Sequence, residues 1–554
     1  MPLLDQIRET KLIELAKTLF DPNLTPAELK VLHDSATSEE IPEPDKKAPR
    51  PELRAAFLRW LATDPEATPQ IDSRGVRVYG FTFSDKLDLE AARIPFRLDF
   101  RCCNAKGEIN LGQAETRDVL FLNSTLEGEQ SFHADTINVH GLLHLTGSCF
   151  SGNIHLGGAK IEGDLDCSGA KLELRNGNTL FADGADVGGD VFLRDGFESS
   201  GEIRIVGAKI KGDLSFSGAK LKGTQKGALN ADGTEIGGNV WFSKNFESSS
   251  KIRLRAARVG GLVAFFGAKV ERVDCTNLDI TGDFYWMGVG ESPTPHLDLR
   301  GASLKNMCDD ELSWVKKDHL CLNGLVYQEL TLHNRPTQQQ IEDEHLPEPL
   351  RLDAKEGTAK RVEWLLRQQD DQCIKPQPWI QLSKYLDARG QHRLAKHVLY
   401  RQKSRQAHAM WPRGRFFVRW LAIAFACLEE VLWRILCPIA ITLLLGTLIF
   451  SGAYRSGAMA RTDSKIAADR YPPFLSFVYT LENVVPLGKL GMDEKWTPDP
   501  THSPQPWFPE YPWLDWLRVF NSYWFLAISR WSLIFLGWFY SAVLGGALLG
   551  RFKQ

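Results

Sequence analysis

"GEIRIVGAKIKGDLSFSGAKL", residues 201–221, is the middle one of three closely similar stretches. The first copy starts at residue 152 and the last at residue 250, so neighbouring copies are 49 residues apart. Inside each copy the unit A-x-[ILV]-x-G recurs with spacers of five or six residues. Because one such unit cannot bury its apolar side alone, the copies must stack on each other. The repeat therefore predicts a parallel β-solenoid in which the alanine and the aliphatic side chain point inward.

The same unit resembles that of the pentapeptide-repeat β-helices, whose repeat centres on A-[DN]-L-x-x. The resemblance implies a right-handed solenoid, but Lys often replaces Asp or Asn here, which argues against a regular square coil. Some proteins of that family imitate DNA with a strongly acidic surface. Residues 151–270 hold 16 Lys/Arg and 14 Asp/Glu, and the whole chain has a net charge of −3. The sequence therefore indicates neither DNA mimicry nor a nucleic-acid partner.

Two stretches near the C-terminus, 435–454 and 531–550, carry no charged residue over 20 positions each. A helix of that length covers about 30 Å, the thickness of a bilayer core. Residues 401–419 carry six Lys/Arg and no acid, and the second stretch is followed by the basic end RFKQ. By the positive-inside rule both flanks face the cytoplasm. We therefore expect a multi-pass protein of the inner membrane, embedded in lipid, with both termini in the cytoplasm.

The segment between the two spans, residues 471–500, has the features of a re-entrant loop. Residues 474–485 have an apolar helical pattern but are too short to cross a bilayer. Proline and glycine then interrupt the backbone, at Pro486, Gly488 and Gly491. Such backbone is tolerated at membrane depth only where protein or water covers it. Glu482 would be an acid near the membrane and is a candidate functional residue. In the alternative, the segment is an external loop anchored on the bilayer by tryptophans such as Trp496.

The stretch "VYTLENVVPLGKLGMDEKWTP" resembles a family of uncharacterised bacterial membrane proteins with the consensus Y-S-L-D-x-x-x-P-x-x-x-L-x-x-E-x-x-W behind a pentapeptide-like repeat. Glu482 replaces the aspartate of that consensus. The helical "PWIQLSKYLDARGQHRLAKHVL" also fits, so the resemblance covers most of the chain. It implies a bacterial membrane protein, and some relatives carry the name membrane-associated oxidoreductase. The matching positions are Tyr479, Leu481, Pro486, Leu490 and Trp496.

Taken together, these patterns predict a mixed fold, in which a parallel solenoid is flanked by helices and followed by a two-helix membrane module. Within the module, an interfacial helix is expected before the first span, and residues 455–530 form the connecting loop. The expected parts are a helical cap at 1–70, the solenoid at 71–328, a helical coupler at 329–409 and the membrane module at 410–554.

Sequence motifs give no support for catalysis. The chain has no dinucleotide-binding glycine motif after a strand, no phosphate-binding loop, no H-E-x-x-H and no G-x-S-x-G. His140 and His144 fall in β-rich sequence, where residues four apart share a face but lie about 13 Å apart, too far to share a metal. The ten cysteines are scattered without a C-x-x-C pair, as in a reducing compartment. We therefore expect no catalytic residue, cofactor or metal, although the absence of a motif does not exclude an enzyme.

Three hypotheses for function remain open from the sequence. In the first, the solenoid binds an unidentified protein or ligand and the two-span module forms a pore. Two helices cannot enclose a water path, so this hypothesis requires a homo-oligomer. In the second the chain is a membrane-associated enzyme, and in the third it is a non-conducting scaffold. Small residues suited to helix packing in the last span are Gly545, Gly546 and Gly550.

Overall fold

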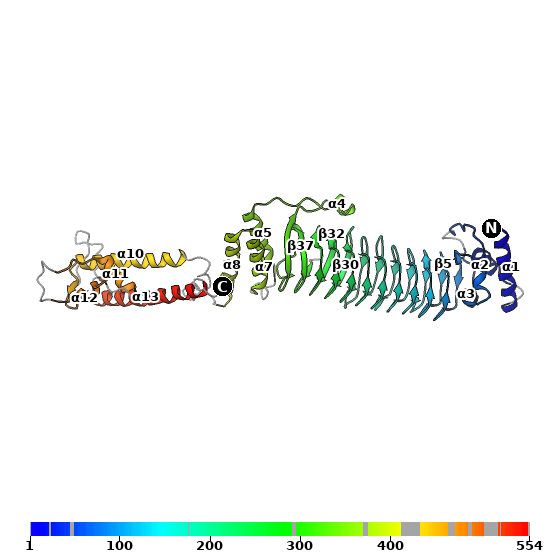
Figure 1. The fold of residues 1–554 in the computed structure, drawn as a ribbon, viewed down its shortest axis with the longest axis horizontal. Coiled ribbons are helices and arrows are strands. Elements are labelled where there is room, and N and C mark those ends of the chain that lie inside the picture. The colour runs from blue at the N-terminus through cyan, green and yellow to red at the C-terminus, as the bar shows by residue number, and fades with distance from the viewer. Residues whose placement is uncertain are drawn as a thin grey trace. The chain divides into compact units, whose positions relative to one another are not determined.

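A computed structural model of the chain divides into two units, Met1–Ala395 and Lys396–Gln554, and each unit is described by itself. The first unit contains the solenoid and its caps, and the second contains the apolar helices (Figure 1). The described residues are 2–20, 24–44, 49–174, 177–290, 295–368, 375–410, 433–463, 471–485, 490–503, 519–520 and 522–551.

The structure confirms the parallel β-solenoid, which has about eleven turns. Its strands form two long parallel sheets of 21 and 18 strands in the described part of the chain. The first sheet runs from β1 (Val76–Tyr79) to β39 (Val326–His333), and the second runs from β2 (Thr82–Phe83) to β38 (Leu320–Cys321). Most strands are only two residues long, with one side chain buried and the other facing outward, and a tight corner follows each pair.

Each 49-residue copy corresponds to two coils of the solenoid, not one. In the first sheet Leu165 pairs with Val191, and Val191 pairs with Leu214, so successive coils are offset by 26 and then 23 residues. Leu214 then pairs with Val240, and Val240 with Val263, with the same two offsets. The longer coil of each pair carries a few extra residues, and two unequal coils therefore make one repeat of the sequence.

A ladder of Asp and Asn side chains holds one corner of the coils together. Asp190 Oδ1 accepts a hydrogen bond of 2.7 Å from the backbone N–H of Asp213 in the next coil. Asp213 Oδ1 accepts a similar bond of 2.7 Å from the N–H of Asn239. The residue before each of these acids is glycine, because a Cβ on Gly212 would overlap with Asp190 Oδ1. The Gly-Asp pairs of the repeat are therefore needed for the stacking of the coils.

The interior of the solenoid is filled by aliphatic side chains and stacked phenylalanines. Phe216 and Phe242 stack with ring centroids 5.2 Å apart, and Phe242 stacks on Phe265 at 4.5 Å. All three are buried. Offset or tilted ring pairs add about 0.5–1.5 kcal/mol each to the energy of burial, so the stacks favour the observed register of the coils.

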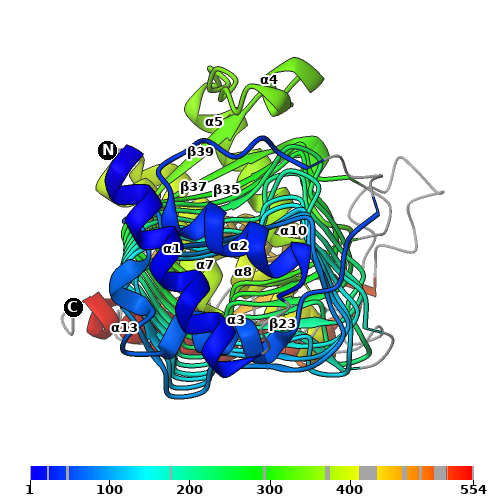
Figure 2. The ribbon, with the colours of Figure 1, turned by 90° about the vertical axis from the view of Figure 1, so that its right-hand side faces the viewer.

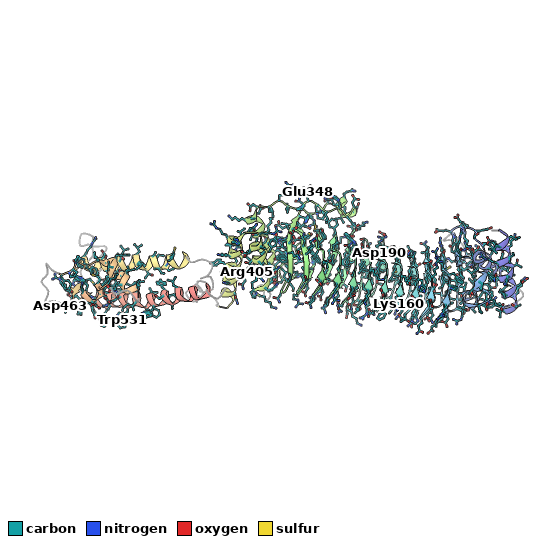
Figure 3. All side chains as sticks on the ribbon, in the orientation of Figure 1. Lys160, Asp190, Glu348, Arg405, Asp463 and Trp531 are labelled. Atoms are coloured by element: carbon teal, nitrogen blue, oxygen red, sulfur yellow. The ribbon has the colours of Figure 1, made fainter. Side chains whose placement is uncertain are left out.

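Opposite charges alternate from coil to coil on the outer surface. On the first sheet the ladder of exposed, paired positions is Lys160, Asp186, Lys209, Glu235, Arg258 and Asp279. On the second sheet it is Lys171, Glu198, Lys220, Glu247 and Lys269. Figure 3 shows Lys160 among the outer side chains. Since facing opposite charges attract and like charges repel, this alternation favours one order of stacking.

We expect Lys209→Glu to lower the stability of the solenoid by about 1 kcal/mol, because it places an acid between Asp186 and Glu235. The measurement is the thermal midpoint of the β-sheet circular dichroism signal. Lys209→Gln removes the attraction without adding repulsion and is expected to cost less. Equal midpoints for the two variants would show that the charge ladder does not contribute.

Helices cover both ends of the solenoid. At the N-terminal end, Arg77 donates hydrogen bonds to the carbonyls of Thr37 and Glu39, and Leu53 N–H donates to Thr82 in the first coil. Figure 2 shows the N-terminal helices in front of the coils. The N-terminal helices are α1 (Pro2–Leu19), α2 (Pro26–Ala36) and α3 (Ala55–Thr63). The helices after the last coil are α4 (Gln338–Glu342), α5 (Ala354–Leu365) and α7 (Gln377–Ala388), followed by α8 (His392–Met410).

The second unit contains two helices that are long and apolar enough to cross a membrane. Its elements are α10 (Trp433–Arg455), β40 (Met459–Arg461), α11 (Ser476–Val484), α12 (Met492–Lys495), β41 (Trp496–Pro498) and α13 (Tyr523–Arg551). The apolar windows are Leu436–Arg455 and Tyr523–Ala542. The second window begins eight residues before the uncharged stretch 531–550. The helix α13 continues through the charged residue Arg530, whereas a stretch defined by the absence of charge has to start after it. The expected interfacial helix lies outside the described residues.

Candidate functional site

The short helix α11 lies between α10 and α13 (Figure 1). Two glycines allow this close packing. A Cβ on Gly446 of α10 would lie 2.5 Å from Thr480 Cγ2, and a Cβ on Gly537 of α13 would overlap with the carbonyl oxygen of Val484. At these two glycines, α10 and α13 therefore pack so closely against α11 that no side chain would fit between them.

The position of these glycines gives the depth of α11 along its neighbours. Gly446 lies nine residues before the end of α10 at Arg455, and Gly537 lies fourteen residues after the start of α13 at Tyr523. At a rise of 1.5 Å per residue these are about 14 and 21 Å along the two helices. The contact with Val484 is thus near the middle of α13. The short helix lies alongside the apolar length of the pair rather than beyond its end.

The carboxylate of Glu482 accepts four backbone hydrogen bonds from the chain that follows α11. Oε1 accepts from the N–H groups of Leu490 at 2.8 Å and Gly491 at 2.7 Å. Oε2 accepts from Met492 at 2.7 Å and Asp493 at 3.1 Å. An ionised carboxylate offers about four lone-pair sites, so these bonds use its whole capacity. Glu482 therefore fastens the returning chain to α11 in this structure and has no lone pair left for an ion.

The surroundings of Glu482 also determine its charge. Burial alone would raise its pKa, but the N–H donors of Gly491, Asp493 and Met492 together lower the pKa below its usual value. The opposite holds for Asp493, whose pKa is raised by burial and by the neighbouring Glu482. The first acid is therefore held in its charged form, while the second takes up a proton more readily.

A charged residue of the second apolar helix joins this cluster. Arg530 Nε donates a hydrogen bond of 3.1 Å to Asn483 Oδ1, and Arg530 Nη2 lies 3.6 Å from Asp493 Oδ2. The guanidinium also lies 6.0 Å from the ring centroid of Tyr479. The side chains of Arg530 and Asp493 remain 26% and 32% exposed. Arg530 thus links α13 to both α11 and α12, and a polar surface stays open beside it.

Aromatic side chains close the other side of the segment. Tyr479 is fully buried, and its ring lies 4.9 Å from Phe450 and 5.4 Å from Phe474. Trp496 packs against Phe474 at 5.6 Å, and its Nε1 donates a hydrogen bond of 3.2 Å to the carbonyl of Pro472. Strands β40 and β41 pair antiparallel next to this cluster and bring Met459 opposite Pro498. The start and the end of the segment 471–500 are therefore held together.

The structure brings some of the candidate residues together. Tyr479 and Glu482 lie on α11, while Trp496 begins β41 and Gly491 precedes α12 with a φ of +79°. The other candidates of the loop, Pro486 and Gly488, lie outside the described residues. Gly545, Gly546 and Gly550 lie in α13, and their surroundings are likewise outside the description.

Five residues of the site were missed from the sequence. Gly446 and Gly537 interrupt otherwise large apolar residues within the two spans, which is the signal that could have identified them. Arg530 stands immediately before the uncharged stretch and could have been read as part of the helix. The other two are Asn483, which has no distinguishing pattern, and Asp493, which together with Glu494 lies near the place of the consensus glutamate but was not singled out as a site residue.

We expect Glu482→Gln to loosen the returning chain and to destabilise the membrane module by about 1–3 kcal/mol. The amide keeps one acceptor oxygen but turns an NH₂ group toward two backbone N–H donors, which are left without an acceptor. Limited proteolysis after Lys489 or Lys495 measures the opening. Glu494→Gln, in the same segment, is the control. An unchanged cleavage rate for Glu482→Gln would contradict the role of Glu482 in holding the chain.

Among the described residues no group of three or more His, Cys, Asp or Glu side chains could hold a metal ion. The exposed His140 lies between two acids, with Nδ1 3.0 Å from Glu162 and Nε2 3.2 Å from Glu115, and these acids raise its pKa. This arrangement is a surface charge network. Comparison of the chain with protein-family models, curated proteins and solved structures finds no match.

Proposed function

We propose that this chain is a membrane-anchored β-solenoid that assembles as a homo-oligomer around a polar path lined by its re-entrant segments. The observation that carries the proposal is the partly exposed pair of Arg530 and Asp493 beside an apolar span. Arg530 lies seven residues, about 10 Å, after the start of α13, where a charge facing lipid costs part of the roughly 2.5–3.5 kcal/mol that it costs at the centre of a span. Copies of the chain arranged around a shared watery cavity would remove that cost.

The arrangement of the backbone supports the same proposal. The segment enters beside the long helices as α11, and Glu482 then holds residues 490 and 491, which belong to no helix or strand. Irregular backbone at membrane depth requires protein or water beside it. Among the described residues of a single copy, α10, α11 and α13 leave this polar surface partly exposed. A ring of copies is the simplest way to cover this surface. In a closed ring, every copy makes the same contact with its neighbour.

In this proposal the solenoid lies in the cytoplasm and presents a rigid surface to a protein or ligand. The basic flank 401–419, with six Lys/Arg and no acid, supports the cytoplasmic side. The assignment to the inner membrane of a bacterium is based on the family resemblance alone. The alternating outer charges of the solenoid suit a partner with mixed charge better than a polyanion.

The test is ion flux through liposomes that contain the purified full-length chain, together with its mass in detergent. We expect several copies per particle and a flux that Arg530→Gln lowers at least about tenfold, which is about 1.4 kcal/mol in the barrier. Arg455→Gln, at the end of α10, is the matched control and is expected to leave the flux unchanged. A monomer that passes no ions under any voltage would overturn the proposal in favour of a scaffold. A bound chromophore in the clean protein would instead favour an enzyme.

A further inference from the structure

The helix α8 has a positively charged face. Four of its basic side chains are exposed, and they are Arg393, Lys396, Arg401 and Arg405. At 100° per residue these positions fall within one half of the helix, while the buried Ala395, Val398 and Gln402 fall in the other half. Figure 3 shows Arg405 on this helix. The basic face therefore lies opposite to the buried side of α8.

The charge of this face is not balanced by acids. The helix contains no Asp or Glu, and none of the four cations forms an ion pair with another described residue. Exposed cations of the solenoid, in contrast, pair with acids of a neighbouring coil. Arg258 Nη1 lies 2.8 Å from Glu235 Oε1, and Lys269 Nζ lies 2.8 Å from Glu247 Oε1. The unbalanced charge thus distinguishes α8 from the outer surface of the solenoid.

The sequence places this face shortly before the membrane module. The helix ends at Met410, and the first apolar window begins 26 residues later, at Leu436. Residues 388–428 hold nine Lys/Arg and no acid, while the whole chain has a net charge of −3, so the rest of the chain is net acidic. An anionic leaflet attracts basic residues next to a span within about 10 Å of its surface. Such a leaflet would therefore attract α8 and repel the rest of the chain.

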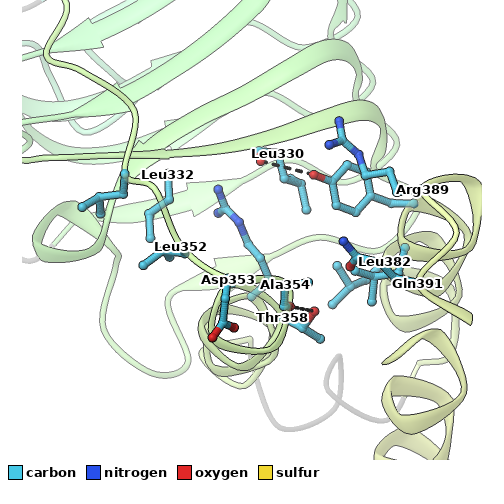
Figure 4. Close-up of a pocket in the computed structure, with 14 residues that line it drawn as sticks. Leu330, Leu332, Leu352, Asp353, Ala354, Thr358, Leu382, Arg389 and Gln391 are labelled. Atoms are coloured by element: carbon cyan, nitrogen blue, oxygen red, sulfur yellow. Dashed lines mark hydrogen bonds between the residues drawn. The ribbon is translucent and has the colours of Figure 1, made fainter. Parts of the chain in front are cut away.

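The start of α8 is attached to the end of the solenoid through α7. Arg389, which follows α7, lies 3.3 Å from Glu329 of β39 (Figure 4). Ser383 Oγ of α7 donates a hydrogen bond of 3.2 Å to the carbonyl of Ala395 in the first turn of α8. A surface that binds α8 is thus connected to the last coil through α7.

We propose that the basic face of α8 binds anionic phospholipid headgroups of the cytoplasmic leaflet. Each cation pairs with a phosphate group, and each contributes about fivefold to the affinity. Because α7 attaches α8 to the last coil, this binding would tether the end of the solenoid to the lipid surface. The inference rests on the membrane anchor of the proposed function but not on its polar path. A chain that passes no ions therefore does not contradict it.

The experiment is hydrogen–deuterium exchange of the full-length chain in lipid nanodiscs, measured in peptides that cover residues 393–405. One kind of disc contains phosphatidylcholine alone, and the other contains phosphatidylglycerol as well. A bound helix exchanges its amide hydrogens only after release and opening, so binding slows the exchange. We expect the exchange to be at least about tenfold slower in the anionic discs at low salt. High salt should remove the difference, because it screens the charges.

Two double variants test whether the basic face causes this difference. Lys396→Gln with Arg401→Gln removes two charges of the face, and is expected to make the exchange equal in both kinds of disc. Lys355→Gln with Lys384→Gln removes two exposed charges from α5 and α7 and is the matched control, which should keep the difference. Unchanged exchange of the solenoid peptides shows that each variant is folded.

Three results would overturn the proposal. The first is equal exchange of 393–405 in both kinds of disc for the native chain, and the second is a full difference in the α8 variant. The third is stronger protection by a duplex oligonucleotide in phosphatidylcholine discs, which would assign the face to nucleic acid. A chain that enters neither kind of disc would instead contradict the membrane anchor, and the inference with it.

Discussion

Gly537→Ala is expected to destabilise the membrane module by about 3 kcal/mol, the upper end of the usual cost of overpacking. The new Cβ would overlap with the carbonyl oxygen of Val484, and backbone cannot turn aside as a side chain does. The short helix α11 must therefore move away from α13. That movement also lengthens the 3.1 Å bond between Arg530 and Asn483. The measurement is the thermal midpoint of the full-length chain in detergent, followed by the near-ultraviolet signal of its tryptophans.

Two further variants separate this effect from a general disturbance of the helix. Ser532→Val adds more volume on the exposed side of α13 and is expected to change the free energy of unfolding by no more than about 0.5 kcal/mol. Gly446→Ala is expected to cost less than Gly537→Ala, because the atom that its Cβ would meet is the movable Cγ2 of Thr480. If Gly537→Ala melts with the native chain, α11 does not pack against α13 as the structure shows.

The solenoid was predictable because its information is local and repeated. When a sequence repeats an inward-facing alanine and aliphatic residue many times, few folds other than a solenoid can bury the apolar side. The number of coils in a copy was not predictable, because it depends on which strands pair. Val191 pairs with Leu214 although the sequence similarity lies between residues 49 positions apart. The ladder from Asp190 to Asp213 likewise appears in the sequence only as a repeated Gly-Asp pair.

The candidate site was predictable only in part, for a related reason. The apolar pattern of 474–485 predicts a short helix, and α11 lies within that range. The role of Glu482 was not accessible, since its partners are backbone N–H groups that any residue supplies. Arg530 lies 47 positions from Asn483, and no local pattern joins the two. Because the span was identified as a stretch without charged residues, Arg530 fell outside it. A charged residue is nevertheless tolerated in a span where the protein provides partners for it.

The second large effect is expected at the end of the solenoid, where Arg361→Ala should cost about 3–5 kcal/mol. Asp309 of β37 (Ser303–Asp310) is fully buried, and Arg361 is the cation that pairs with it. Trp314 Nε1 also donates a hydrogen bond of 3.0 Å to Asp309, but a neutral donor does not balance its charge. Removing the guanidinium leaves a carboxylate in a dry interior. Thermal or chemical unfolding of the full-length chain, followed by circular dichroism, measures the loss.

The pH dependence distinguishes a lost charge pair from a simple loss of packing. Burial raises the pKa of Asp309, and Arg361 opposes the rise, so the pKa should be higher still in Arg361→Ala. A group whose pKa is raised on folding loses stability as pH increases from its unfolded value. The cost of Arg361→Ala should therefore be smaller near the usual Asp pKa of about 4 than at neutral pH. The double variant Asp309→Asn with Arg361→Gln should recover most of the loss at neutral pH, because it buries no unpaired charge. A double variant as unstable as Arg361→Ala, with no dependence on pH, would show that the arginine contributes through its packing alone.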